Sequence, residues 1–91
     1  MKINIMDTLT LDDNNEYVVV SKVKYENKNY YYLSEIKKPQ NILFCYEDKD
    51  ELVELIDGNL IIKLLPLFVG NTKKVITEDE MKTILEKIPK D

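Results

Sequence analysis

Through most of the first 58 positions, apolar residues alternate with polar ones, and this period of two is typical of β-strands. Short clusters of Asp, Asn, Lys and Pro interrupt the alternation and favour turns, because these residues tolerate or impose turn backbone angles. The segments between the clusters are residues 5–11, 16–25, 30–37, 41–47 and 51–56. The pattern predicts an antiparallel sheet of four to five strands, connected as a meander.

Residues 16–37 form the clearest predicted hairpin, and its second half holds four of the chain's six tyrosines: Tyr25, Tyr30, Tyr31 and Tyr32. A two-residue loop at Glu26-Asn27 or at Asn27-Lys28 gives the same alternation of faces. One face is expected to lie inward under the helices, and it carries Tyr17, Val19, Val23, Tyr30, Tyr32 and Ile36. The other face is expected to point outward, and it carries Val18, Val20, Tyr31 and Leu33.

The preceding turn, DDNN, decides which face Leu9 joins. A two-residue loop would place this leucine on the half-charged face of the second strand. A three-residue loop with Asn15 left-handed is expected instead, because it gathers the apolar residues on one face. That register puts Leu11 opposite Tyr17. Leu9 then lies opposite Val19.

A first helix is predicted within residues 60–68, where apolar residues recur at helical spacing and Asn59 is the expected N-cap. Pro66 removes one helical hydrogen bond. We therefore expect about two turns of helix that tighten or kink at the proline, with a strand as the alternative. Residues 70–74 are expected to form a linker.

The C-terminal helix, residues 77–89, carries the strongest local signal in the chain. Thr77 and Glu80 form a capping box, and Ile76 with Met81 has the spacing of a hydrophobic staple. One apolar stripe runs along the helix: Met81, Ile84, Leu85 and Ile88. A helix of about eleven residues is marginal alone in water, so this stripe is expected to pack against another element. Pro89, directly after Ile88, is expected to end the helix.

The whole chain of 91 residues fits a single domain. Within it we expect the sheet in residues 1–58, the short helix in 59–69, a linker in 70–76 and the C-terminal helix in 77–89. A run of strands followed by helices defines the α+β class.

Composition argues against an enzyme. The chain has no histidine, which is the commonest general base and the commonest metal ligand. It also has no arginine, whose planar guanidinium group binds phosphate through paired hydrogen bonds. Cys45, the single cysteine, lies in the middle of a strand and is expected to be a buried, inert thiol. The two glycines, Gly58 and Gly70, form no phosphate-binding loop. No catalytic, cofactor-binding or metal-ligating residue is therefore assigned.

The net charge of −4 is concentrated in one block, since residues 41–62 sum to −5 whereas residues 16–40 sum to +2. The acidic stretch 47–57 is interpreted as a solvated face. Its spacing of carboxylates, like that of the first turn, lacks the pattern and the glycine of a calcium loop. Tyrosines flanked by lysines are also found on surfaces that stack single-stranded RNA, but an acidic chain without arginine disfavours nucleic-acid binding.

The location expected for this chain is the cytoplasm. A single cysteine gives no internal disulfide, and the N-terminal segment lacks the apolar core of a signal peptide. The longest apolar run, residues 64–69, contains a proline and is far too short to span a bilayer, so no membrane association is expected.

Residues 7–68 carry a resemblance to a known family. They run from D-T-L-T-L-x-D-x-N-E-Y-x-V through K-Y-E-N-K-x-Y-Y-Y-L to a return strand and an acidic stretch. This pattern is similar to the YrzB-like family of small acidic bacterial proteins, domain of unknown function 1292. The chain departs from that family in having Asn27 where glycine is common, and in the helix after Gly70. The resemblance implies a soluble cytoplasmic protein without a characterised activity, and it carries over no catalytic residue.

Two hypotheses for function follow. The first is a non-enzymatic protein-interaction module that binds a protein partner, or a second copy of itself, through an exposed sheet face. The candidate partner surface is Val18, Val20, Tyr31 and Leu33. The alternative is an acidic phage-type inhibitor that uses residues 47–57 to occupy a basic nucleic-acid groove on a host enzyme.

Overall fold

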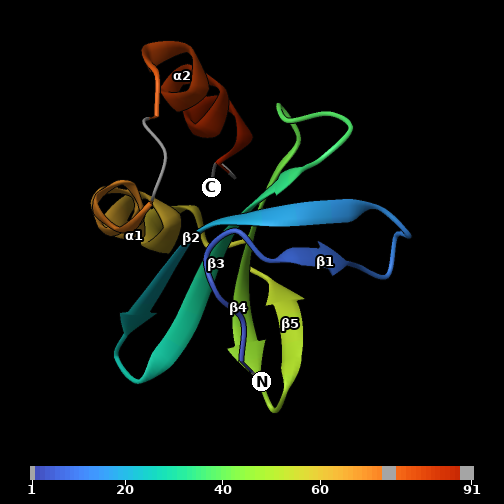
Figure 1. Cartoon of the computed structure of the whole chain (residues 1–91). Helices are drawn as coiled ribbons and strands as arrows, with labels where there is room; N and C mark the ends of the chain where they lie inside the picture. The colour runs from blue at the N-terminus through green and yellow to red at the C-terminus, as the bar shows by residue number, and fades with distance from the viewer. Residues whose placement is uncertain (1, 73–75, 89–91) are drawn as a thin grey trace.

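The computed structural model describes residues 2–72 and 76–88. Five strands come first in the chain and two helices follow (Figure 1). The strands are β1 (Thr8–Thr10), β2 (Glu16–Tyr25), β3 (Lys28–Glu35), β4 (Ile42–Asp48) and β5 (Glu51–Glu54), and the helices are α1 (Gly58–Asn71) and α2 (Glu78–Lys87). The strands pair antiparallel in the order β1-β2-β3-β4-β5, which confirms the predicted α+β fold built on a meander.

The turn between β1 and β2 lies one residue earlier than predicted. Leu11 N–H donates to Asn15 O at 3.1 Å, so the loop has the expected three residues but occupies residues 12–14. Asn14, not Asn15, takes the left-handed conformation, with φ of 64°. Leu9 consequently pairs with Tyr17, two positions from its expected partner. A shift of two keeps Leu9 on the same face as Tyr17 and Val19, as expected, although this face is the one without helices.

Two of the three later turns of the meander, those between β2 and β3 and between β4 and β5, are tight. Glu26 and Asn27 have φ of 49° and 65°, which identifies a two-residue hairpin loop and confirms one of the two loops expected there. Lys49 and Asp50, between β4 and β5, repeat the same pair of angles. Short loops of this kind hold neighbouring strands in one fixed register.

A β-bulge at Val20 changes the facing of β2. Val19 pairs with Leu33 and Ser21 pairs with Tyr32, so Val20 is an extra residue on this strand. An extra residue reverses the alternation of side chains on one side of the bulge relative to the other. The simple alternation expected from the sequence is therefore correct beyond the bulge and wrong before it.

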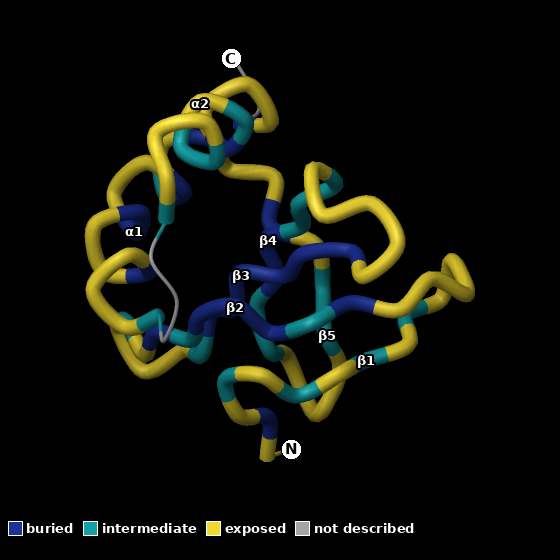
Figure 2. The backbone as a smooth tube through the Cα atoms, turned by 45° about the horizontal axis from the view of Figure 1, so that its top comes forward, coloured by how far each residue is buried: buried dark blue, intermediate teal, exposed yellow. Residues whose placement is uncertain are grey.

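The sheet buries apolar residues on both faces. The cluster on the helix side consists of Val20, Val23, Tyr30, Tyr32, Phe44, Leu55, Ile61, Leu64, Leu65, Phe68, Ile84 and Ile88. The cluster on the other face consists of Ile3, Tyr17, Val19, Tyr31, Leu33 and Cys45. Figure 2 shows the buried stretches running along the central strands, with the helices to one side of them.

The expected inward face is thus only partly correct. Val23, Tyr30 and Tyr32 lie under the helices as predicted. Tyr17 and Val19 lie on the opposite face, because the bulge separates them from the rest of β2. Ile36 lies beyond the end of β3 and is exposed.

Helix α1 confirms the helical interpretation of residues 60–68 over the strand alternative, but its bounds are wider than expected. Asp57, rather than Asn59, is the N-cap: its Oδ1 accepts a hydrogen bond from Leu60 N–H at 3.2 Å. The helix continues past Pro66 through Gly70 and Asn71, which were expected to begin the linker. The rest of that expected linker includes residues 73–75, which lie outside the described residues.

The C-terminal end of α1 is held against the bulge by side-chain hydrogen bonds. Ser21 Oγ donates to Phe68 O at 2.6 Å, and Thr72 Oγ1 donates to Val20 O at 2.9 Å. Asn71 Nδ2 donates to Lys22 O at 3.1 Å. A bulge leaves a backbone carbonyl without a hydrogen bond to the neighbouring strand. Here Thr72, directly after α1, donates the hydrogen bond to the carbonyl of Val20.

Helix α2 begins as predicted. Thr77 is the N-cap, and its Oγ1 accepts a hydrogen bond from Glu80 N–H at 3.2 Å. Ile84 and Ile88 are buried in the helix-side cluster, whereas Leu85, expected in the same stripe, is exposed. The predicted stop at Pro89 lies outside the described residues. Within the described part of the chain, no helix is long and apolar enough to cross a lipid bilayer.

Candidate functional site

The four residues expected to form an exposed partner surface do not form one. Val20, Tyr31 and Leu33 are buried, and Val18 is half-buried. Val18 and Val20 pack in the helix-side cluster, whereas Tyr31 and Leu33 pack in the cluster on the other face. The bulge at Val20 explains the error for Val18 and Val20, because it moves the first half of β2 to the opposite side from the one expected. Tyr31 and Leu33 lie on the expected face, but Ile3 and the leucines of the edge strands pack in the same cluster and bury them.

The structure places a groove on the face of the sheet that carries no helix. Its walls come from the two edge strands, β1 and β5, which lie near each other because the sheet curls (Figures 1 and 2). The groove is open to solvent and has a volume of about 810 Å³. This volume lies within the range of pockets that bind ligands in proteins.

The floor of the groove is apolar. Its apolar lining residues are Ile3, Leu9, Leu11, Tyr17, Leu43, Cys45 and Leu52. The four leucines are half-buried and pack against the smaller buried cluster. The groove therefore continues the second core of the protein out to solvent.

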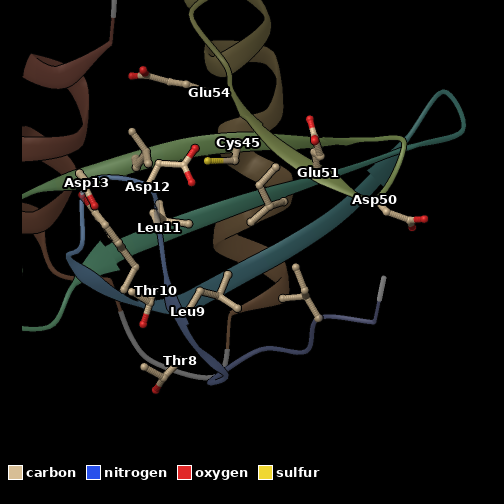
Figure 3. Close-up of a pocket in the computed structure, with 14 residues that line it drawn as sticks. Thr8, Leu9, Thr10, Leu11, Asp12, Asp13, Cys45, Asp50, Glu51 and Glu54 are labelled. Carbon is tan, nitrogen blue, oxygen red and sulfur yellow. Dashed lines mark hydrogen bonds between the residues drawn. The ribbon is translucent and has the colours of Figure 1, made fainter.

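The charged residues that line the groove are all acidic. They are Asp12 and Asp13 from the first turn, and Asp50, Glu51 and Glu54 from the end of the meander. In Figure 3 the carboxylates of Asp12 and Asp13 lie on the left, those of Asp50 and Glu51 on the right, and Glu54 above. Lys22, on the same face of β2, is not part of the lining and donates its Nζ to Ile3 O at 2.9 Å. The groove is therefore a region of negative potential with an apolar floor.

Asp13 is fixed in its charged form. The hydrogen bond donated by Asn15 N–H at 2.9 Å holds the pKa of Asp13 below its ordinary value of 3.8, with a further contribution from Tyr17. Tyr17 Oη donates to Asp13 Oδ2 at 2.9 Å, which ties the first turn to the floor. Burial, together with this carboxylate, raises the pKa of Tyr17 above its ordinary 10.0.

Two further groups beneath the groove are kept neutral by burial. Burial raises the pKa of the Cys45 thiol from 9.0 to about 12, and the charge of Glu54 adds to the effect. Burial also raises the pKa of Tyr31 from 10.0 to about 12, helped by Glu47 Oε1, which accepts a hydrogen bond from Tyr31 Oη at 2.9 Å. At neutral pH the thiol is protonated, which is the unreactive form.

The reactive side chains that line the groove are its carboxylates and the buried thiol of Cys45. Among residues 2–72 and 76–88, no set of three or more His, Cys, Asp or Glu side chains is placed to hold a metal ion. Cys45 is buried as predicted, and the chain has no histidine to act as its base. What the site can supply is apolar contact, negative charge and the backbone of two strand edges.

Alkaline pH is expected to unfold the protein through these groups. A group whose pKa is higher in the folded state than in the unfolded state stabilises the protein. This stabilisation is complete below the pKa of the unfolded state and is lost as the pH rises through the pKa of the folded state. For Cys45 the loss runs from about pH 9 to 12, and for Tyr31 from about pH 10 to 12. Urea unfolding across this range should show the free energy of unfolding falling from pH 9, and Cys45→Ala should delay the onset of the fall. If Cys45→Ala left the pH dependence of the free energy of unfolding unchanged, the raised pKa of Cys45 would not be a cause of the alkaline unfolding.

Sequence reasoning identified part of this face without recognising the groove. Along residues 41–47 the sequence sets Leu43 and Cys45 against Ile42, Phe44 and Tyr46, and the two buried clusters separate these residues in the same way. The same alternation signals a second apolar face. The curl that brings β1 near β5 has no local signal in the sequence, so the groove between them was missed.

No family model matches the chain, and no curated protein or solved structure matches it significantly.

Proposed function

We propose that this protein is a non-enzymatic interaction module that binds a partner protein in the groove between β1 and β5. The observation that carries the proposal is the groove itself: half-buried leucines open to solvent on a helix-free face, surrounded by carboxylates. Exposed apolar surface rimmed by polar groups is typical of protein-binding sites. The absence of a disulfide and the raised pKa of Cys45 fit the cytoplasmic location that we propose for it.

The groove favours a different protein over a second copy of this one. A symmetric dimer formed through the groove would bring two acidic rims together, and the chain already carries a net charge of −4. Like charges facing each other across an interface oppose association. Membership of the YrzB-like family remains a proposal that rests on the pattern of residues 7–68.

A second candidate function rests on the acidic end of the meander. Asp48, Asp50, Glu51 and Glu54 are exposed there, at and beside the tight turn between β4 and β5. These carboxylates could occupy the basic groove of a nucleic-acid enzyme, as in the acidic inhibitor considered above. Such binding would depend on charge alone and would survive replacement of the apolar floor.

The test is a selection of random displayed peptides on the folded protein, followed by binding assays with matched variants. Leu52→Lys places a charge on the groove wall, whereas Ile62→Lys changes an exposed apolar residue of α1. Binders should lose at least about tenfold in affinity on Leu52→Lys and keep their affinity on Ile62→Lys. Circular dichroism of both variants checks that each one folds. Binders that respond equally to both variants, or only to Ile62→Lys, would place the binding surface elsewhere.

A further inference from the structure

The edge of β5 that faces the groove presents backbone groups to a binding partner. Leu55 N–H donates to Phe44 O at 2.8 Å, so residues 51, 53 and 55 direct their backbone groups toward β4. Hydrogen bonding alternates along an antiparallel strand. Leu52 and Glu54 consequently direct their N–H and C=O away from β4, and no strand among the described residues pairs with that side.

The edge of β1 is arranged in the same way. Val19 N–H donates to Asp7 O at 2.8 Å, and Leu11 N–H donates to Asn15 O at 3.1 Å. These bonds fix the alternation, so Thr8 and Thr10 direct their backbone groups away from β2. Both threonines line the groove, as do Leu52 and Glu54.

The connectivity of the sheet determines which way a further strand would run. In a meander every second strand has the same direction, so β1 and β5 run parallel to each other. One extended segment that lies antiparallel to β5 is therefore antiparallel to β1 as well. Strand addition to a free edge is a common way for a sheet to bind a peptide, because the backbone supplies affinity and alternate side chains supply specificity.

The lining determines the side chains that such a segment would carry. Alternate residues of an added strand would face the leucines of the floor. Glu54 lies two residues from Leu52 and therefore on the same face of β5, whereas Glu51 lies on the other face. Lysine or arginine is therefore favoured opposite Glu54, among the side chains beside Glu51, and in the residues that flank the paired stretch near Asp12 and Asp13. β5 has four residues, so the paired stretch spans about 13 Å at the rise of an extended chain.

On the basis of the proposed function, we propose that the occupant of the groove is an extended segment of a partner protein, which adds as a strand antiparallel to β5. Within this segment, apolar residues alternate with lysine or arginine. The two arguments are independent, because the outward backbone groups specify a strand and the carboxylate rim specifies its charge. The charge of the rim disfavours a second copy of this chain as the partner, since its net charge is −4.

The experiment starts from groove-dependent peptides selected on the full chain. Their sequences should show apolar residues alternating with Lys or Arg. N-methylation of alternate residues in the best peptide, which removes N–H donors without changing charge, should lower its affinity at least about tenfold in one of the two alternating sets. Glu54→Gln together with Glu51→Gln should weaken binding about tenfold and flatten its salt dependence, whereas the matched pair Glu78→Gln with Glu86→Gln on α2 should not.

The outcomes separate the two proposals. Groove-dependent peptides that lack basic residues, or whose affinity ignores N-methylation in both alternating sets, overturn strand addition and leave the interaction module standing. Peptides that bind independently of Leu52 overturn both.

Discussion

Replacing Phe68 with alanine is expected to destabilise the protein by about 3–5 kcal/mol, a large part of the total stability of a small domain. Phe68 is completely buried in the middle of the helix-side cluster. Its ring centroid lies 5.7 Å from that of Phe44 and 6.3 Å from that of Tyr32. Truncation removes these aromatic contacts and leaves a cavity between α1 and the sheet.

The matched control is Leu67→Ala, which changes the neighbouring residue of the same helix. Leu67 is exposed, so its truncation should change the free energy of unfolding by less than about 0.5 kcal/mol. Urea unfolding followed by circular dichroism measures both variants. Equal losses in the two variants would mean that α1 is not docked through Phe68.

Leu33→Asp is expected to prevent stable folding, with a loss exceeding about 5 kcal/mol. Leu33 is completely buried on the helix-free face, beside Tyr31 and Val19. The substitution removes apolar burial and introduces a carboxylate whose short side chain cannot reach solvent. This prediction separates the structure from the sequence pattern, which placed Leu33 on an exposed face where aspartate would be harmless.

Thr8→Asp provides the comparison for the Leu33 variant. Thr8 lies exposed on the edge strand β1, so the same new side chain should lower the stability there by less than about 1 kcal/mol. The comparison is made by far-ultraviolet circular dichroism and urea titration at neutral pH. A Leu33→Asp protein as stable as the Thr8→Asp protein would contradict the second core.

Local signals in the sequence predicted local structure well. The loop at Glu26-Asn27 is one of the two that the alternation allowed, and the start of α2 follows from the capping pair Thr77 and Glu80. In β4 the side chains follow the unbroken alternation of the sequence, which sets Ile42 and Phe44 apart from Cys45. These features depend on residues within a few positions of one another.

The errors arise where distant residues decide the conformation. Val20 can be an extra residue because Thr72, 52 positions later, binds its carbonyl, and Ser21 binds Phe68 across 47 positions. The sequence places no glycine or proline at the bulge to announce it. The bulge in turn places Tyr17 and Val19 on the helix-free face and Val18 and Val20 on the helix side, so the partner surface expected from simple alternation is divided between the two faces.

The groove explains why the second face of the sheet is apolar. A meander with helices on one side leaves its other face to solvent, and a polar face would be the ordinary outcome. Here that face carries a buried cluster of its own, and at the groove it opens to solvent between two free strand edges. The proposed interaction module would use this exposed apolar lining to bind its partner.

Amide hydrogen exchange, followed by NMR on the labelled protein with and without a selected peptide, tests this account most directly. The outward N–H groups of Leu52 and Glu54 should exchange rapidly in the free protein and slow at least about tenfold when peptide is bound. Exchange and chemical shifts at Ile62 and Val69, on the outer side of α1, should not change. Changes confined to α1, with Leu52 and Glu54 unaffected, would contradict the groove as the binding site.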